Sequence, residues 1–555
     1  MARPLEQQTA TVTMDTLYDY IIVGAGSAGA ILANRLSESG EHRVLLLEAG
    51  GEANSFWFKL PVGYIKSYFN PKTNWMFYST PQMHLGGRRL YAPRGKVVGG
   101  SGAINAMIYV RGQAQDFDDW QLAGNPGWGF TDLLPYFKKL EAHPQGGSTW
   151  RGGQGPIGIT PMKGMVHPIC DDYLAACEAL NLPHTEDFNG AQFEGSGIYE
   201  TNIRRGQRSS SGFEYLQPIR RRKNLTVMTH AQALRLLFAA GAPRRVNGVR
   251  VCKGEHEFNV LAQREVILAA GAVGSPQLLQ CSGIGDANVL KNFGIQIRHH
   301  LPGVGQNLQD HLCASFYYQA NRPTLNDEFT SLWGQMRAGL QYAFTRSGPL
   351  SLSVNQAGGF FKGSEQEVRA NLQLYFNPLS YTIPPTPQAK LKPEPYSGFL
   401  MAFNACRPAS TGEIRILSAD ARQAPSIDPN YLSAARDQEE VLQAMRLIRR
   451  LTETAPMRSL IHQEVAPGLK AQTDEQMLSY FKDNCGSIYH LCGTCAMGSD
   501  PTKSVVDAQL RVHGVHGLRV IDASIFPNIT SGNINAPTMM VAEKGAALLL
   551  SASST

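Results

Sequence analysis

Features that would define whole classes of protein are missing from this sequence. No stretch approaches the roughly 20 consecutive apolar residues of a membrane-spanning helix, and residues 1–16 are polar, without the apolar core of a secretory signal. The 9 cysteines are odd in number and irregularly spaced, which argues against a disulfide framework. We therefore expect a cytoplasmic protein with no transmembrane segment, and leave peripheral attachment to a membrane open.

The net charge is also small: charged residues make up 17% of the chain, which is ordinary for a globular enzyme, and the formal net charge is only +6. The densest basic run, at 220–223, contains no interleaved aromatic residues, so it indicates a solvated surface patch and not a nucleic-acid site. Cys492 and Cys495 form one C-x-x-C without a second, and no cluster has the spacing of metal ligands. We expect neither a metal ion nor a nucleic-acid partner.

Glycine, in contrast, is abundant, with 55 residues, or about a tenth of the chain against a usual ~7%. The apolar run 20–23 leads into the turn GAGSAG at 24–29, a helical pattern follows, and a second apolar run at 44–47 ends in Glu48. This order predicts a βαβ unit at the start of a parallel sheet. Similar apolar runs at 266–270 and 518–521 predict strands of the same sheet.

The glycine turn has the residues that dinucleotide binding requires. Gly24 permits the tight turn, Gly26 lets the backbone approach a pyrophosphate, and Gly29 lets the helix pack on the strand. The pyrophosphate then lies at the helix N-terminus, where free N–H groups favour negative charge. Glu48, 19 residues after Gly29, is placed to accept hydrogen bonds from ribose hydroxyls. No second complete unit is present for a nicotinamide, which favours a tightly held flavin.

Two further glycine-rich segments follow. Residues 95–112 contain five glycines and make a poor helix or strand interior, but they are suited to laying backbone against a planar ligand. Residues 271–285 follow a strand and open a helix, with Ser275 as the expected N-cap and Pro276 at the first helical position.

The C-terminal part carries HLCGTC at 490–495, DASIFP at 522–527 and SGNINAPT at 531–538. With the preceding segments these motifs resemble, in order, those of the glucose–methanol–choline (GMC) oxidoreductase family, from residue 18 to about 550. The resemblance implies an α/β fold: a Rossmann-like FAD-binding domain of the glucose oxidase type and a second α+β substrate domain on a six-stranded antiparallel sheet. We expect the FAD-binding domain at 15–160, 201–311 and 467–555, and the substrate domain at 161–200 and 312–466.

The resemblance also implies roles for individual residues. The histidine of H-x-x-G-T-C faces flavin N5 in this family, which here is His490, and its partner six residues after Pro527 is Asn533. Some members attach the flavin covalently through a histidine where this chain has Ile104, so we expect non-covalent FAD. Leu491 replaces the proline that usually follows the histidine. The expected FAD-binding residues are Gly24, Gly26, Ser27, Ala28, Gly29, Glu48, Ala49, Gly99, Asn105, Ala106, Met107, Ala233, Asp522 and Asn535.

The chemistry of alcohol oxidation suits these residues. A hydroxyl becomes a good hydride source only once it is partly deprotonated, and histidine, with a pKa near ~6.5, suits that proton transfer. We expect a primary alcohol to be oxidised to an aldehyde, with oxygen or a quinone-like or protein acceptor taking the electrons. An FAD-retaining hydroxynitrile lyase and a non-catalytic flavin-binding protein are the alternatives. The histidines without motif context, including His143 and His311, are expected to be structural or exposed.

Overall fold

The computed structural model describes residues 17–382, 392–468 and 471–552. The polar segment 1–16 lies outside the described residues. Two seven-stranded sheets organise the chain, and each is assembled from segments that are distant in sequence. No helix in the described ranges is long and apolar enough to cross a membrane.

The first sheet has the predicted parallel centre. Strands β12 (Leu225–Met228), β2 (Val44–Leu47), β1 (Leu17–Val23), β15 (His256–Leu268) and β28 (Leu518–Val520) run parallel. All four residues of β2 are buried, as expected of a parallel strand covered on both faces. The hairpin β13 (Ala231–Phe238) and β14 (Val246–Lys253) extends the other half of β15 in antiparallel fashion. The βαβ unit and both distant strands are therefore present as predicted.

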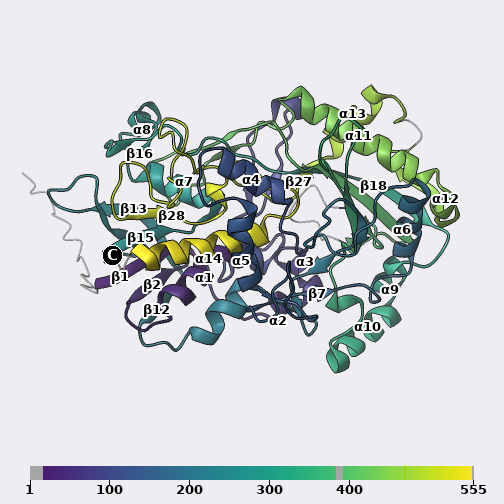
Figure 1. Ribbon diagram of the computed structural model, residues 1–555, viewed down its shortest axis with the longest axis horizontal. Coiled ribbons are helices and arrows are strands. Elements are labelled where there is room, and N and C mark those ends of the chain that lie inside the picture. Colours follow the sequence, from purple (N-terminus) through teal and green to yellow (C-terminus); the bar gives the residue numbers. More distant parts are fainter. Residues whose placement is uncertain (1–16, 383–391, 469–470, 553–555) are drawn as a thin grey trace, which may run out of the picture.

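Three helices pack together beside this sheet (Figure 1). They are α1 (Ser27–Leu36), α5 (Phe130–Leu140) and the C-terminal α14 (Asn535–Ala552), which contacts both of the others. Buried Glu543 of α14 accepts hydrogen bonds from Arg35 of α1 at 2.8 Å and from Tyr215 at 2.7 Å. The C-terminus is thus fixed against the first helix, which brings the residues before α14 close to the glycine turn.

The second sheet is antiparallel. Its order is β26 (Ile461–Ala466), β18 (Leu312–Ala320), β23 (Gly398–Ala405), β20 (Leu372–Asn377), β19 (Ala357–Phe361) and β8 (Gly195–Ile198). A seventh, short strand, β27 (Gly486–Ser487), pairs with the start of β18. The six strands of this order match the six-stranded sheet that the family resemblance implies, and β27 is an addition to it. Helices α6 (Ile169–Ala179), α11 (Ala435–Thr452), α12 (Ala455–Leu460) and α13 (Asp474–Asn484) share its apolar core.

The expected start of the helix at 271–285 was wrong. Helix α7 spans Gly271–Cys281, so Ser275 and Pro276 lie inside it. Ser275 is not the N-cap, because it lies inside the helix; its hydroxyl accepts from the N–H of Ala270 at 3.2 Å and donates to Asp522 at 2.6 Å. Pro276 lacks the N–H that would bond the carbonyl of Ala272, and the hydroxyl of Thr494 donates to that carbonyl at 2.6 Å instead. A partner from a distant segment thus makes the interior proline tolerable.

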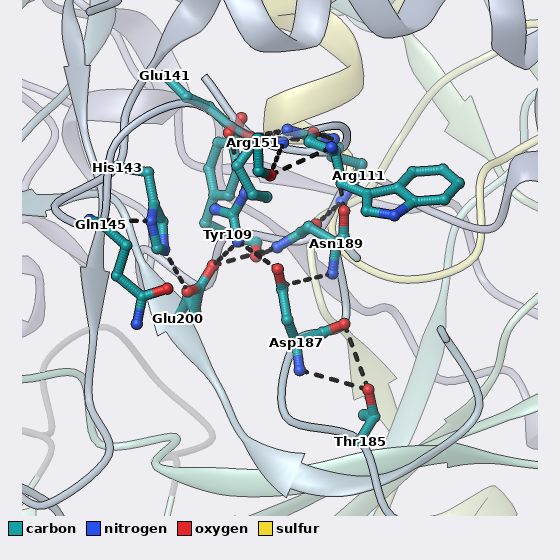
Figure 2. A network of polar contacts seen from close by, with 12 residues as sticks. Tyr109, Arg111, Glu141, His143, Gln145, Arg151, Thr185, Asp187, Asn189 and Glu200 are labelled. Carbon is teal, nitrogen blue, oxygen red and sulfur yellow. Dashed lines mark hydrogen bonds and ion pairs between the residues drawn. The ribbon is translucent and has the colours of Figure 1, made fainter. Parts of the chain in front are cut away.

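A buried ion network connects the glycine-rich loop to the segment that enters the second sheet (Figure 2). Arg111 donates to Glu141 at 2.9 Å, and Arg151 contacts Glu141 at 3.0 Å and Glu200 at 2.6 Å. The backbone N–H of Tyr109 donates to the carbonyl of Glu200 at 2.8 Å. Because a buried charge without a partner is costly, these pairs fix the backbone before residue 112 against the segment that follows β8.

Candidate functional site

A cavity of about 1370 Å³ contains nearly all of the residues expected to act. It exceeds the roughly 300–1,000 Å³ of ordinary small-molecule pockets, so it has room for a dinucleotide and a substrate together. Its walls combine the β1–α1 turn with residues of the second sheet and with the segment that carries His490.

The glycine turn fits a pyrophosphate. Gly24 has a φ of 102°, a conformation that favours glycine, and a Cβ on Gly29 would lie 1.8 Å from the carbonyl oxygen of Gly24. Helix α1 has Gly26 as its N-cap with no side-chain cap, and Gly26, Ser27 and Ala28 line the cavity. The uncapped N–H groups of a helix N-terminus are an anion site. The glycines therefore allow the close approach that FAD requires.

Glu48 lies at the end of β2, as the sequence predicts. One carboxylate oxygen accepts from the N–H of Ala25 at 3.0 Å and the other from that of Gly50 at 2.8 Å. Burial raises the pKa of Glu48 to about 7, against the opposing effect of these two backbone hydrogen bonds. A carboxylate has further lone pairs, so Glu48 can also accept from a ribose hydroxyl.

The other expected FAD-binding residues lie around the same cavity, with two exceptions. Those lining it are Gly24, Gly26, Ser27, Ala28, Glu48, Ala49, Asn105, Ala106, Met107, Ala233, Asp522 and Asn535. Gly29 and Gly99 do not line it. Gly29 lies where α1 approaches the strand, and the N–H of Gly99 donates to the carbonyl of Ala25 at 2.8 Å. These two glycines therefore support the conformation of the turn without lining the cavity.

His490 is brought to the cavity by the pairing of β27 with β18. Leu312 pairs with Ser487, so the residues just before β18 lie against those just after β27. His490 donates its backbone N–H to Asp310 at 2.7 Å, and Asp310 also accepts from Ser487 and from Tyr431, each at 2.5 Å. Asp310 thereby fixes the chain that carries His490.

The proton positions on His490 follow from its partners. His311 Nε2 lies 2.8 Å from the carbonyl oxygen of Cys406, which can only accept, so Nε2 carries the proton. In neutral His311, Nδ1 is then an acceptor, and it lies 2.8 Å from Nδ1 of His490, which must donate. The remaining nitrogen of His490, Nε2, is unprotonated and lies 3.3 Å from the amide nitrogen of Asn533. The base therefore faces Asn533.

The surroundings keep both rings neutral. Burial, then repulsion from His311 and Arg94, holds the pKa of His490 well below 6.5. Burial lowers the pKa of His311 to about 4, opposed by its hydrogen bond to Cys406. The expectation that His311 is only structural or exposed missed this contact, because 179 residues separate the two histidines and no local motif marks the pair. His143, in contrast, contacts Glu200 at 3.0 Å in the ion network.

The two asparagines of SGNINAPT face different partners. Asn533 lies beside His490 and accepts from the amide of Gln373 at 3.5 Å, whereas Asn535 begins α14 and accepts from the hydroxyl of Ser27 at 2.8 Å. The geometry thus puts Asn533 with the base and Asn535 with the glycine turn. Gln373, buried on β20, is a further positioning residue that the sequence did not indicate.

The backbone before His490 is strained. Tyr489 has a φ of 72°, which is uncommon for a residue with a Cβ. Its N–H donates to Ser487 at 2.8 Å, its carbonyl accepts from Arg94, and its hydroxyl contacts that of Tyr68. These contacts hold the strained residue and turn His490 toward the cavity.

Sulfur and metal chemistry have no assembled site in the described chain. Cys492 and Cys495 are buried free thiols, and burial holds the pKa of each thiol well above its usual value. Within the described ranges, no group of three or more histidines, cysteines or carboxylates is arranged to hold a metal ion.

Comparison with known proteins identifies the family. Family models described as GMC oxidoreductase match residues 18–313 and 408–542. The chain is 39% identical over 540 residues to an oxygen-dependent choline dehydrogenase of Photobacterium profundum, covering 97% of this chain and 94% of that protein. Identity to the protein of the same description from Escherichia coli (strain K12) is 38% over 533 residues, covering 95% and 94%.

Solved structures agree with this family. A pyridoxine 4-oxidase from Mesorbium loti superposes with a TM-score of 0.85 at 31% identity, covering 95% of this chain and 98% of that one. A formate oxidase superposes with a TM-score of 0.90 at 27% identity, covering 98% and 99%. These likenesses confirm the expected fold class and the FAD cofactor. The chain belongs to the GMC oxidoreductase family and is an FAD-dependent oxidoreductase acting on CH–OH groups.

Proposed function

We propose that this protein oxidises a primary alcohol to an aldehyde, with His490 as the general base and Asn533 holding the substrate oxygen. The observation that carries the proposal is the unprotonated Nε2 of His490, which lies 3.3 Å from the Asn533 amide in the cavity that the glycine turn also lines. When bound, FAD supplies the acceptor for the hydride. The residues expected to hold it are the β1–α1 turn, Glu48 and Asn535.

The residues of the site supply proton transfer and orientation. Nε2 of His490 takes the hydroxyl proton while His311 accepts from Nδ1–H, so the ring keeps its orientation as it becomes charged. The amide of Asn533 donates to the developing alkoxide without adding a net charge. Because Ile104 lines the cavity where some relatives have a flavin-linked histidine, we propose that FAD is held non-covalently.

The cavity favours a neutral alcohol. Carboxylates lining it in the described part of the chain are Glu48, Asp522, Glu394 and Asp483. Glu48 and Asp522 accept hydrogen bonds from backbone N–H groups of the glycine-rich turns. Asp483 is exposed, and Glu394 accepts from Thr382 at 2.6 Å. The remaining wall includes several aromatic side chains: Tyr68, Phe69, Tyr91, Tyr317, Tyr375, Tyr381 and Tyr489. An alcohol with an apolar body suits this lining.

Choline is the second candidate, because the relatives at 38–39% identity are named choline dehydrogenases. A quaternary ammonium could bind to the aromatic faces without a carboxylate. We would compare anaerobic flavin reduction by choline with reduction by neutral primary alcohols of similar size, and then repeat turnover with oxygen and with an artificial quinone-like acceptor. Faster reduction by the neutral alcohols supports the proposal, whereas a clear preference for choline replaces it with the second candidate.

The alternatives without redox turnover make a different prediction. A lyase of the hydroxynitrile type or a non-catalytic flavin protein would leave the flavin oxidised after anaerobic addition of every alcohol in the panel. We propose that the flavin is bleached, since both His490 and Asn533 are present and adjacent.

The free thiols of all 9 cysteines also suit a reducing compartment, and we propose the cytoplasm.

A further inference from the structure

Helix α10 (Leu332–Thr345) presents an apolar face to solvent. Leu332, Trp333 and Phe344 are 86%, 72% and 84% exposed, and Met336 and Leu340 between them are also exposed. We call these five residues the α10 apolar face. Single exposed apolar residues are ordinary, but a contiguous set on one helix marks an interaction surface.

The packing of α10 sets which side faces outward. Gly334, Ala338 and Tyr342 are buried, and the ridge from Leu332 to Phe344 lies about 180° away around the helix. A Cβ on Gly334 would lie 2.2 Å from the carbonyl oxygen of Glu328, and the Tyr342 hydroxyl donates to the carbonyl of Gly206 at 3.0 Å. Rotating α10 to bury its apolar face would break both close contacts. The exposure is therefore fixed by the fold.

Basic residues surround this face. Helix α10 contains one arginine, Arg337, which pairs with Glu328 at 3.3 Å, and no acidic residue. Arg346, at its C-terminal end, is exposed and lies beside Gly206, whose neighbour Arg205 is exposed as well. The ring of Phe56 also packs against Tyr342, and exposed Lys66 lies over the neighbouring Trp57. An apolar stripe with tryptophan and phenylalanine, bordered by cations, is typical of a helix that lies in a membrane interface.

The position of α10 relative to the cavity adds a second argument. Phe329 of α9 (Leu325–Thr330) and Gln335 of α10 line the cavity that contains His490, whereas the α10 apolar face does not. Figure 1 shows α9 and α10 at the edge of the molecule, beside the second sheet. A surface bound to this face would therefore lie next to one wall of the cavity.

We propose that the α10 apolar face docks onto an anionic phospholipid bilayer, lying in its interface without crossing it. A second copy of the chain fits the face less well, because α10 is only about 21 Å long, and a face of that length and helical width falls far short of the roughly 800 Å² that each partner buries in a stable interface. Delivery of an apolar alcohol from the bilayer would follow, and that consequence alone rests on the proposed function.

The test is vesicle flotation of the holoenzyme. We expect binding to vesicles of phosphatidylcholine mixed with phosphatidylglycerol, and weaker binding to phosphatidylcholine alone. The double variant Trp333→Glu/Phe344→Glu should lower the partition coefficient at least ~10-fold, because two large side chains lose their apolar burial. The matched control Leu122→Glu/Val368→Glu makes the same charge change at residues that are 80% and 90% exposed elsewhere, and it should bind like the wild type.

Two further measurements keep the result interpretable. All variants should keep their FAD content and their activity on a water-soluble alcohol, because none of the four residues lines the cavity. A wild type that does not float with either vesicle, or a control that loses binding equally, overturns the proposal. A solution dimer that Trp333→Glu/Phe344→Glu dissociates would also overturn it, since the face would then hold a second copy. Flotation needs no substrate, so its failure is distinct from failure of the proposed reaction.

Discussion

Nδ1 of His311 and Nδ1 of His490 lie 2.8 Å apart, at the point where the second sheet meets the segment carrying the proposed base. Only one proton fits between two facing ring nitrogens, and the carbonyl of Cys406 decides which ring supplies it. Protonating His311 would place a donor against the Nδ1–H of His490. Both rings must therefore be neutral for the two Nδ1 atoms to lie at hydrogen-bonding distance.

The first prediction concerns stability below neutral pH. The pKa of His311 is about 4 in the folded chain and ~6.5 when unfolded. Between these values the unfolded state binds more protons at this side chain, so the stability that His311 contributes is present above pH ~6.5 and is lost as the pH falls toward 4. The shift corresponds to up to about 3 kcal/mol, and His490 adds a loss of the same sign.

Urea unfolding of the wild type at several pH values in this window measures the loss. His311→Gln should have a shallower pH dependence than the wild type, although its stability at neutral pH should be lower. Exposed His256 provides the control, and His256→Gln should keep the wild-type dependence. Equal slopes for all three proteins would show that His311 titrates normally in the folded state.

The second prediction separates the two asparagines. Asn533→Ala should slow anaerobic flavin reduction by ~10²-fold with unchanged FAD content, because it removes a donor to the developing alkoxide. Asn535→Ala breaks the hydrogen bond to Ser27 at the glycine turn, so it should mainly lower FAD occupancy. FAD stoichiometry and reduction rates on both variants test this. The assignment would be reversed if Asn535→Ala kept its flavin and reduced slowly.

The third prediction concerns the ribose contact. Glu48→Ala should weaken FAD binding much more than it alters flavin reduction in the remaining holoenzyme, because hydrogen bonds to the ribose are equal in ground and transition states. Glu48→Gln keeps a side-chain acceptor of the same size and should lie between the wild type and the alanine variant. Titration of the apoproteins with FAD gives the affinities. An inactive alanine variant with full FAD occupancy would contradict the role.

The fourth prediction concerns attachment of the cofactor. The purified protein should be yellow, and acid or heat denaturation should release free FAD into the supernatant, because Ile104 offers no nucleophile to the flavin. Absorbance of the supernatant and of the redissolved pellet measures the two fractions. Flavin that stays with the precipitated chain would show a covalent link from another residue.

The sequence predicted those parts of the fold that local patterns encode. The βαβ unit was readable because an apolar run, a glycine turn and Glu48 follow one another within about 30 residues. Strand β27 was not, because it has two residues and forms only by pairing with β18. The start of α7 was also misplaced, since Ser275 lies inside the helix and its hydroxyl bonds Asp522, 247 residues away. Such tertiary partners leave no local signal.

The same limit applies to the site: residues in local motifs could be predicted from the sequence, and residues outside such motifs could not. His490, Asn533 and Asn535 lie in motifs, so their neighbourhood could be predicted, and their detailed roles stay predictions. His311 and Gln373 could not be found, because 179 and 160 residues separate them from His490 and Asn533 and neither lies in a motif with its partner. The division into five segments at 160, 200, 311 and 466 likewise stays a prediction.

The central claim is that His490 removes the hydroxyl proton, and anaerobic flavin reduction in His490→Ala tests it most directly. With a primary alcohol that reduces the wild type, the variant should keep its FAD but reduce it roughly 10²–10⁴-fold more slowly, the usual scale for a lost acid–base group. His256→Ala, at an exposed position, should match the wild type. Reduction of His490→Ala at nearly the wild-type rate, with FAD fully bound, would contradict the account and place the base elsewhere.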